Sequence, residues 1–140
     1  MASRFLTWEI VKNHHAYIMK RPNIRTLSKE PGNVRNIHSF KANGFIHPKT
    51  IDIQPAKDNK GVVITRRKRN KMNRPAAQTK SMIMKTGPRR LLWKVARVIV
   101  TDRYRHDLKK AAMRRASAIL QSQKPKKIKK RGGAKPAAKK

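Results

Sequence analysis

The sequence contains no cysteine, and aromatic and hydrophobic residues are also scarce. The absence of cysteine excludes disulfide bonds, a thiolate zinc site and a cysteine nucleophile. Aromatic residues make up 5% and hydrophobic residues 37% of the chain, against roughly 45–50% apolar residues in globular domains. We therefore expect a small core, and recognition of phosphate, sugar and shape rather than extensive base stacking.

Acidic residues are scarce as well, and this shortage has a direct functional meaning. Six Asp and Glu oppose 38 Lys and Arg, so the 140 residues carry a formal net charge of +32. Self-repulsion of so much like charge opposes a compact state, so a polyanion is expected to belong to the working structure. Nucleic acid is the favoured polyanion, because Lys and Arg that neutralise its phosphates release counterions.

Long apolar runs and enzyme motifs are missing too. No apolar run approaches the roughly 18 residues of a membrane span, and neither GxxxxGK nor GxGxxG occurs. Asp102, His106 and Ser117 come without a nucleophile motif, and the adjacent His14 and His15 have no nearby partner ligands. The sequence thus predicts that the protein is not an enzyme. It also predicts that the protein binds no metal, cofactor, small-molecule substrate or membrane.

Residues 1–65 have the pattern of a small antiparallel meander with one helix. Apolar spacing predicts the helix from Arg4 to about Lys12, and Phe5, Trp8 and Tyr17 are assigned to the core. Strands are expected at 16–19, at 34–41, around 51–53 and, best of all, in the β-branched run at 62–65.

Residues 66–87 are predicted to form a basic arm with little regular structure. Six of the nine residues at 66–74 are Lys or Arg, and a connection of about twenty residues is usually functional or disordered. We expect the arm to lie along RNA or DNA phosphates, although a nuclear localisation signal or a solvated loop has the same composition. The predicted contact residues are Arg66, Arg67, Lys68, Arg69, Lys71 and Arg74.

Residues 88–123 are predicted to form two helices packed on the sheet. Pro88 suits a first helical position, and the stripe of the first helix is Leu91, Leu92, Val95, Val98 and Ile99. Asp107 is expected to cap the second helix, whose stripe is Leu108, Ala111, Ala112, Ala116, Ile119 and Leu120.

The outward faces of these helices and their connection are basic, and too few acidic residues exist to pair with them. We expect phosphate contacts there, with Trp93 and Tyr104 also able to stack on a base. An ordinary solvated surface is the alternative. The residues assigned to nucleic-acid contact are Arg89, Arg90, Lys94, Arg97, Arg103, Tyr104, Arg105, Lys109, Lys110, Arg114 and Arg115.

Residues 124–140 are predicted to be a disordered basic tail, because nine of these seventeen residues are Lys or Arg and none can build a core. Sequence-neutral phosphate contact is expected, with a bland solvated tail as the alternative. The tail residues assigned to contact are Lys126, Lys127, Lys129, Lys130 and Arg131. Altogether the pattern predicts an α+β fold: a small antiparallel sheet, a short N-terminal helix, two C-terminal helices and basic extensions.

Several segments resemble the eukaryotic-type family of large-subunit ribosomal protein twenty-eight. The matching stretches are His38–Phe40, Asn43–Thr50, Lys60–Val63, Trp8 with Val11–Asn13 and, most specifically, Ala111–Pro125. The resemblance implies a structural protein of the large subunit of the cytosolic ribosome, bound to large-subunit ribosomal RNA and to neighbouring ribosomal proteins. It also implies a cytoplasmic location with nucleolar passage during assembly.

Two other readings remain open from the sequence. The ending at 135–140 is similar to the tails of linker-histone-type chromatin proteins, although the strand-rich first half argues against that class. A ribosome-assembly factor with a related domain is the other alternative, but the long acidic regions that such factors tend to carry are absent here.

Overall fold

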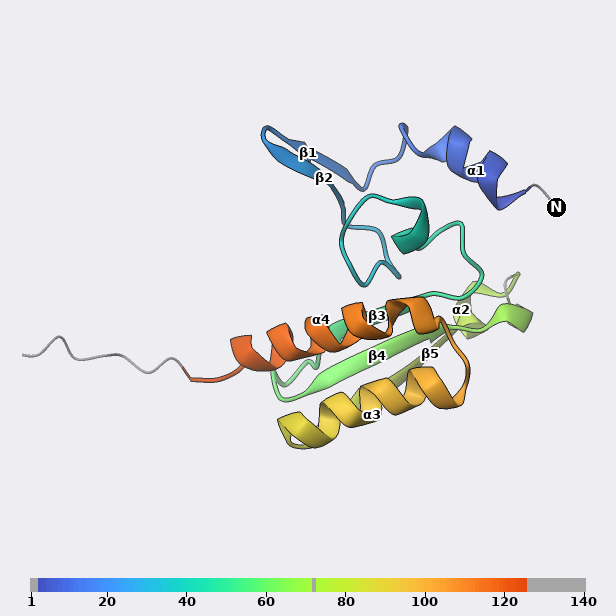
Figure 1. Ribbon diagram of the computed structural model, residues 1–140. Helices are drawn as coiled ribbons and strands as arrows, with labels where there is room; N and C mark the ends of the chain where they lie inside the picture. Colours follow the sequence, from blue (N-terminus) through green and yellow to red (C-terminus); the bar gives the residue numbers. More distant parts are fainter. Residues whose placement is uncertain (1–2, 72, 126–140) are drawn as a thin grey trace, which may run out of the picture.

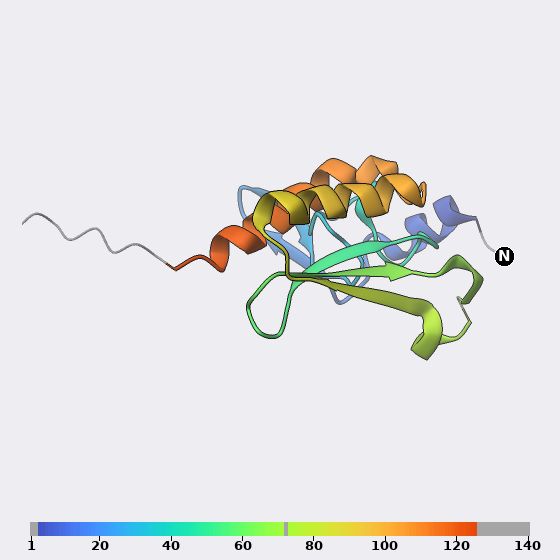
Figure 2. The ribbon, with the colours of Figure 1, turned by 90° about the horizontal axis from the view of Figure 1, so that it is seen from below.

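A three-stranded antiparallel sheet and two helices form the larger part of the structure. In the computed structural model the sheet has the order β3 (Ile51–Pro55), β4 (Val62–Arg67), β5 (Thr79–Met84). Figure 2 shows that the two long helices, α3 (Pro88–Thr101) and α4 (Lys109–Ser122), cover the same face of this sheet. We call these five elements the sheet-and-helix core.

Strand alternation places one apolar face of the sheet against the helices. The register pairs Ile53 with Ile64 and Ile64 with Met82, so these three side chains point to the same side. Ile53 and Ile64 are buried in the hydrophobic cluster, whereas Ile83, one position along β5, is exposed on the opposite face.

The apolar stripes predicted for the two C-terminal helices are confirmed. Leu91, Val95 and Ile99 of α3 are fully buried, as are Ala112 and Ala116 of α4. The two alanines have no side chain beyond Cβ, so α4 packs closely against α3 and β3.

The N-terminal lobe, residues 3–50, consists of short elements joined by loops. Helix α1 (Arg4–Val11) is followed by a hairpin of β1 (Ile18–Arg21) and β2 (Ile24–Ser28), and then by the 3-10 turn η1 (Phe40–Ala42). Figure 1 shows this lobe beside β3 and α4, on the side away from α3. With these elements, the fold is α+β as predicted.

Aromatic and histidine rings hold much of the N-terminal lobe together. Phe5 stacks on Phe40 with ring centroids 5.1 Å apart, and Trp8 lies at 5.1 Å from His38. The assignment of Phe5 and Tyr17 to the core is wrong, because Phe5 is 70% exposed and Tyr17 is also exposed at the periphery of the lobe. Helix α1 therefore packs on rings of the lobe without burying a single residue fully.

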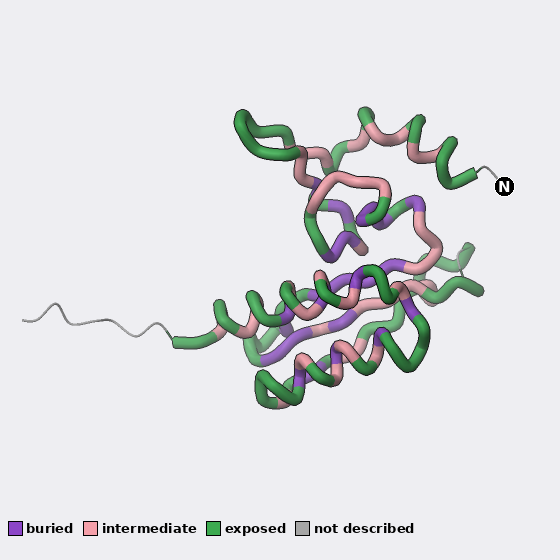
Figure 3. The backbone as a smooth tube through the Cα atoms, viewed as in Figure 1, coloured by how far each residue is buried: buried purple, intermediate pink, exposed green. Residues whose placement is uncertain are grey.

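A buried polar network replaces the strand expected at 34–41. Glu30 is 3% exposed and accepts hydrogen bonds from the side-chain amides of Asn33 at 2.9 Å and Asn43 at 2.8 Å. Asn43 in turn accepts from the backbone N–H of Phe45 at 2.8 Å. Figure 3 shows the buried stretches of this loop beside the sheet. Hydrogen bonding to side chains, rather than strand pairing, therefore shapes this segment.

Residues 66–87 have more regular structure than predicted. Arg66 and Arg67 belong to β4, and the chain continues through the 3-10 turn η2 (Arg69–Lys71) and the short helix α2 (Pro75–Gln78). Strand β5 then completes the sheet, although only the last half of its sequence TKSMIM is apolar. The expectation of little regular structure in this stretch is therefore wrong, because pairing with β4 creates a strand from a weakly patterned segment.

The second long helix also begins differently from the prediction. The 3-10 turn η3 (His106–Leu108) precedes α4, and Leu108 occupies the N-cap position. Asp107 does not cap the helix, because its carboxylate accepts hydrogen bonds from the guanidinium of Arg105.

The structure describes residues 3–71 and 73–125. The predicted contact residues of the tail, from Lys126 to Arg131, lie outside the described residues. Within the described ranges, no helix has both the length and the apolar character needed to cross a membrane. The same ranges contain no group of three or more His, Asp or Glu side chains placed to hold a metal ion.

Candidate nucleic-acid interface

All six acidic side chains have partners inside the protein. Glu30 accepts from two amides, as described above, and the other five carboxylates form ion pairs with basic side chains. These pairs are Lys12–Glu9, Arg66–Asp102, Lys85–Asp58, Arg105–Asp107 and Arg115–Asp52. Because 38 Lys and Arg oppose these few acids, most of the positive charge is left for anions outside the chain.

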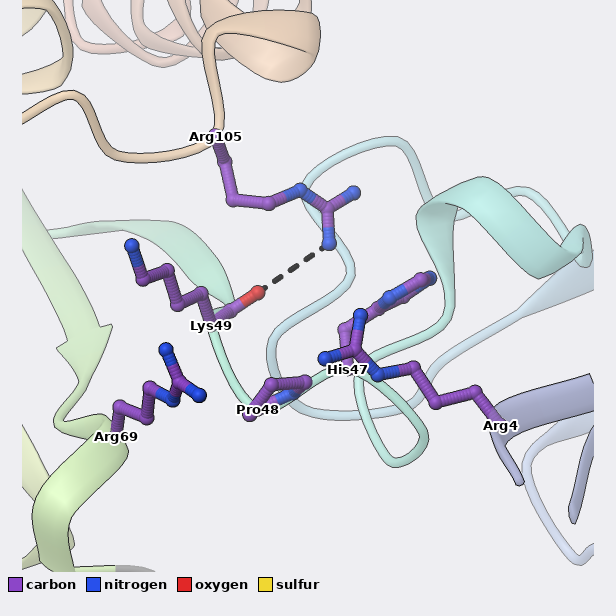
Figure 4. A pocket seen from close by; sticks show the side chains of 6 residues that line it. All are labelled: Arg4, His47, Pro48, Lys49, Arg69 and Arg105. Atoms are coloured by element: carbon purple, nitrogen blue, oxygen red, sulfur yellow. Dashed lines mark hydrogen bonds between the residues drawn. The ribbon is translucent and has the colours of Figure 1, made fainter.

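One concentration of this charge is a hollow between the N-terminal lobe and the sheet-and-helix core. Its volume is about 260 Å³, and we call it the cationic hollow. Figure 4 shows Arg4, Arg69 and Arg105 reaching toward Pro48 from three sides. The lining residues come from α1, η2, the loop before β3 and the loop between α3 and α4: they are Arg4, His47, Pro48, Lys49, Arg69 and Arg105.

Arg105 is the fixed member of the cationic hollow. Its backbone adopts a left-handed conformation with φ of 50°, and its guanidinium forms a two-pronged pair with Asp107 at 3.0 and 2.9 Å. It also donates to the carbonyls of Lys49 at 3.3 Å and Lys41 at 2.6 Å. Arg105 therefore ties the α3–α4 connection to the N-terminal lobe, and Asp107 balances its charge.

Arg4, Lys49 and Arg69, the other basic side chains of the hollow, form no ion pair within the described residues. His47 Nε2 donates to the carbonyl of Phe40 at 2.7 Å. Burial lowers the pKa of His47, and the positive charges of Arg105 and Arg4 lower it further. Burial would raise the pKa of Asp107, but hydrogen bonds and charge from Arg105 hold that pKa below its ordinary value. The hollow is thus electropositive, and the Asp107 carboxylate beside it is ionised.

The arm residues predicted to contact phosphate divide into two groups. Arg66 pairs with Asp102 and Arg67 donates to the carbonyl of His47 at 3.4 Å, so both serve internal contacts. The remaining four are exposed on the β4–β5 connection: Lys68, Arg69, Lys71 and Arg74. Arg69 joins the cationic hollow, so the exposed arm continues from it.

The helical residues divide in the same way. Arg115 is half-buried and donates to the carbonyl of Ile53 at 2.7 Å and the side-chain oxygen of Asn36 at 2.8 Å. It fastens α4 to β3 and to the N-terminal lobe, so its guanidinium already has internal acceptors. The outward-facing residues are Arg89, Arg90, Arg97, Arg103, Lys110 and Arg114, with Lys94 and Lys109 half-buried.

Tyr104, for which the sequence left base stacking open, is buried in the structure. Its ring belongs to the hydrophobic core cluster, and its hydroxyl donates to the carbonyls of Thr50 at 3.0 Å and Arg67 at 2.6 Å. Burial, only partly offset by these hydrogen bonds, raises the pKa of Tyr104. The ring packs against Lys49 and Arg66 instead, each cation lying 5.6 Å from its centroid.

A second basic hollow, of about 400 Å³, lies between α4 and the loop at 34–37. Arg35 and Arg114 line it from opposite sides, and both are exposed. Arg114 belongs to the predicted set, whereas Arg35 does not. The basic surface therefore extends from the sheet-and-helix core onto the N-terminal lobe.

Comparison with protein-family models gives one match that spans most of these elements. The model described as the ribosomal L28e protein family matches residues 6–122. The chain belongs to the ribosomal L28e protein family. The match runs from α1 through α4 and includes every residue of the cationic hollow except Arg4. This family consists of ribosomal proteins and not of enzymes, and the expected resemblance is confirmed.

Two similar proteins carry the same printed name, large ribosomal subunit protein eL28. The one from Schizosaccharomyces pombe is 30% identical over 128 residues, which cover 89% of this chain and 96% of that protein. The one from Dictyostelium discoideum is 32% identical over 117 residues, covering 84% of this chain and 86% of that protein. Similarity to these relatives therefore extends along nearly the whole chain.

Sequence reasoning missed the residues that tertiary structure brings to the interface. Arg4, Arg35 and Lys49 are isolated basic residues in weakly patterned surroundings, and no local run marks them. Lys49 and Arg69 line one hollow because β3 pairs with β4, and Arg4 lines it too because α1 packs on the lobe. No signal in the single sequence would have identified these three residues of the L28e-family chain as part of the interface.

Proposed function

We propose that this chain is a structural constituent of the large subunit of the cytosolic ribosome and binds large-subunit ribosomal RNA through phosphate and shape contacts. The two relatives named above supply the large-subunit assignment. The observation that supports RNA binding most directly is the cationic hollow, where basic side chains from four separate segments surround one space. Among the described residues, Asp107 is the one carboxylate that forms an ion pair with any of them.

The chemistry of the hollow suits a backbone phosphate. A phosphate presents several acceptor oxygens, and arginine guanidinium groups can donate to them in pairs. Arg4, Lys49 and Arg69 supply positive charge, while Arg105 is held in place by its own hydrogen bonds and needs no rearrangement. Arg105 therefore fixes the wall of the hollow before binding, whereas the side chains of Arg4, Lys49 and Arg69 become ordered when the phosphate binds.

The contact surface that we propose extends outward from this hollow. Along the β4–β5 connection it continues onto exposed Lys and Arg, and across the molecule it includes the basic faces of both long helices. The tail residues between Lys126 and Arg131 keep their assignment as sequence-neutral phosphate contacts. The central set is Arg4, Arg35, Lys49, Lys68, Arg69, Lys71, Arg74, Arg89, Arg90, Arg97, Arg103, Lys110 and Arg114.

The salt dependence of binding tests this function. A variant with Lys68, Arg69, Lys71 and Arg74 changed to Gln removes four exposed cations without touching an ion pair. If each contacts one phosphate, the slope of log K against log salt for a large-subunit RNA fragment falls by about 3. An unchanged slope contradicts phosphate contact by this segment.

The chain offers a matched control for this variant. Lys20, Arg21, Arg25 and Lys57 are also two lysines and two arginines, all exposed, on the β1–β2 hairpin and the β3–β4 turn. Neutralising them changes the net charge by the same amount. We expect a clearly smaller fall in slope, since these residues lie outside the proposed surface.

Sedimentation of the protein from cell extracts distinguishes the ribosomal role from the alternatives. A structural constituent is found in mature large subunits and in translating ribosomes, in the cytoplasm, after passing through the nucleolus during assembly. An assembly factor is released before the particles mature, and a linker-histone-like protein sediments with chromatin. Absence from mature large subunits contradicts the proposal, and its neighbours in the particle are expected to include other ribosomal proteins.

A further inference from the structure

A groove between α3 and the edge strand β5 has a composition unlike that of the cationic hollow. Its volume is about 500 Å³, and we call it the Trp93 groove. Met82, Met84 and Val98 supply apolar surface, and Trp93 lines the groove with 56% of its area exposed. The neighbouring helical turn carries Arg97, whose guanidinium carbon lies 5.0 Å from the centroid of the Trp93 ring.

The rim of the Trp93 groove is positively charged. Lys80 of β5 and Lys94 of α3 line it together with Arg97, and no ion pair is formed by any of these three within the described residues. The one carboxylate in the lining, Asp102, is already paired with Arg66. A ligand that fits must therefore combine a flat apolar group for the ring with negative charge for the rim.

We propose that the Trp93 groove binds one unpaired nucleotide of an RNA strand, with the base stacked on Trp93 and the adjoining phosphates against Lys80 and Lys94. Arg97 lies over the indole, and Trp93 is still 56% exposed, so ring surface remains on which a base can stack. Stacking on an aromatic ring needs no particular base, because every base has a π face. This inference rests on the proposed RNA binding and adds to it a site that recognises a base rather than phosphate alone.

A protein segment is a poorer match to the same groove. A peptide that pairs with the free edge of β5 would need several carboxylates spaced to meet the basic rim, as well as a side chain for Trp93. A nucleotide carries both the planar group and the charge in one unit. Charge complementarity therefore favours the nucleotide, and an acidic peptide becomes an outcome that the experiment can reveal.

Tryptophan fluorescence reads out this site directly. The chain has two tryptophans, so the Trp8→Phe variant of the full chain reports on Trp93 alone. We titrate it with oligoadenosine of about six nucleotides and with a strand of the same length whose residues carry no base. The proposal predicts saturable quenching of Trp93 by oligoadenosine and no comparable quenching by the abasic strand.

Affinity measurements with substituted proteins complete the test. Trp93→Ala should weaken binding of oligoadenosine about tenfold and leave binding of the abasic strand unchanged. Trp93→Phe, which keeps a ring, should recover part of the loss. Tyr17→Ala removes an exposed aromatic ring directly before β1, a strand that Figure 1 shows well away from α3 and β5, and should change neither affinity. Circular dichroism of each variant establishes that it is folded, and the quenching assay needs no substitution at Trp93.

The possible results separate this inference from the general function. If both strands bind equally and Trp93 fluorescence stays constant, the nucleotide site is overturned while phosphate binding stands. If neither strand binds, both proposals are overturned. If polyglutamate quenches Trp93 and displaces oligoadenosine with higher affinity, the groove is a site for an acidic protein segment and the nucleotide assignment is overturned.

Discussion

The sheet-and-helix core and the N-terminal lobe are held together by different chemistry. In the core, isoleucine, valine and leucine side chains from strands and helices are fully buried against one another. In the lobe, the buried apolar side chains among the described residues are only Val34, Ala42 and Ile46. Ring contacts and the hydrogen bonds of Glu30 add to them, and α1 buries no residue completely. The core therefore has an apolar driving force of its own, whereas the lobe depends on satisfied polar groups and on its attachment to the core.

This difference suggests that the core and the lobe would respond differently to bound RNA. The cationic hollow takes Arg4 and His47 from the lobe and Arg69 and Arg105 from the η2 turn and the α3–α4 connection. An anion bound there contacts both regions at once and stabilises their relative position by mass action. If the proposed RNA binding holds, we expect the core to act as a rigid frame and the order of the lobe to depend more strongly on the bound polyanion.

The largest expected effect comes from breaking the core. Val95 is fully buried in α3, so Val95→Asp places a charge without a partner among aliphatic side chains. We expect a loss of about 3–5 kcal/mol in the free energy of unfolding, and loss of helical circular dichroism if that exceeds the total. The matched control is Val100→Asp, at an exposed position of the same helix, which should cost no more than about 0.5 kcal/mol. Equal stability of both variants would mean that α3 does not pack as described.

A smaller and more local effect is expected from the polar network of the lobe. Glu30→Ala leaves the side-chain amides of Asn33 and Asn43 without their acceptor, at a cost of about 2 kcal/mol. Hydrogen exchange should show loss of protection at 30–46 with protection of β4 and α3 retained. Glu9→Ala, which removes an exposed ion pair on α1, should change hydrogen-exchange protection very little. Equal loss of protection in core and lobe would contradict the comparison between them.

The connection between the two regions can be weakened separately. Arg115 reaches from α4 to the carbonyl of Ile53 and the side chain of Asn36 with two nitrogens of its guanidinium. Lysine has a single ammonium nitrogen and cannot make both contacts in the same way. We expect Arg115→Lys to cost about 1 kcal/mol and to raise exchange at 34–36. The adjacent Arg114→Lys, at an exposed position, should leave thermal stability unchanged, and the same result for both variants would rule out Arg115 as the link.

The sequence predicts the two long helices of the sheet-and-helix core better than it predicts the N-terminal lobe. The stripes of α3 and α4 are local patterns, since residues three and four apart share a helix face whatever surrounds them. Strand β5 was missed because its identity depends on pairing with β4, and the lobe was misjudged because buried Glu30 and exposed Phe5 invert the usual preferences. The basic character of the interface is visible in the composition, but Arg4 and Lys49 enter it only through tertiary contacts.

The smallest expected effect is a difference in the response of the two regions to acid. Burial lowers the pKa of His47, with the charges of Arg105 and Arg4 adding to it, and burial followed by the charge of His38 lowers the pKa of His15. The ring nitrogens of His15 are also buried without a hydrogen-bond partner within the described residues.

The sign of the effect follows from these directions. Each unfolded imidazole takes up its proton near the ordinary value of 6.5, at a higher pH than the folded one. The stability that these groups contribute is therefore complete above pH 6.5 and declines as the pH falls through the lowered folded values. Protonation should loosen the lobe, where both side chains lie, before it loosens the core.

Hydrogen-exchange protection factors, with intrinsic exchange rates divided out, measure this response between about pH 7.5 and about pH 5.5. We expect protection at 15–47 to fall while protection of β4 and α3 holds. A double variant, His15→Gln with His47→Gln, keeps an N–H donor toward Phe40 and removes both titrating rings, so the fall should be strongly reduced. His14→Gln, at the exposed neighbouring position, should leave the profile as it is. If the double variant keeps the full pH response, or if the core loses protection before the lobe, then His15 and His47 are not the cause of the acid sensitivity of the lobe.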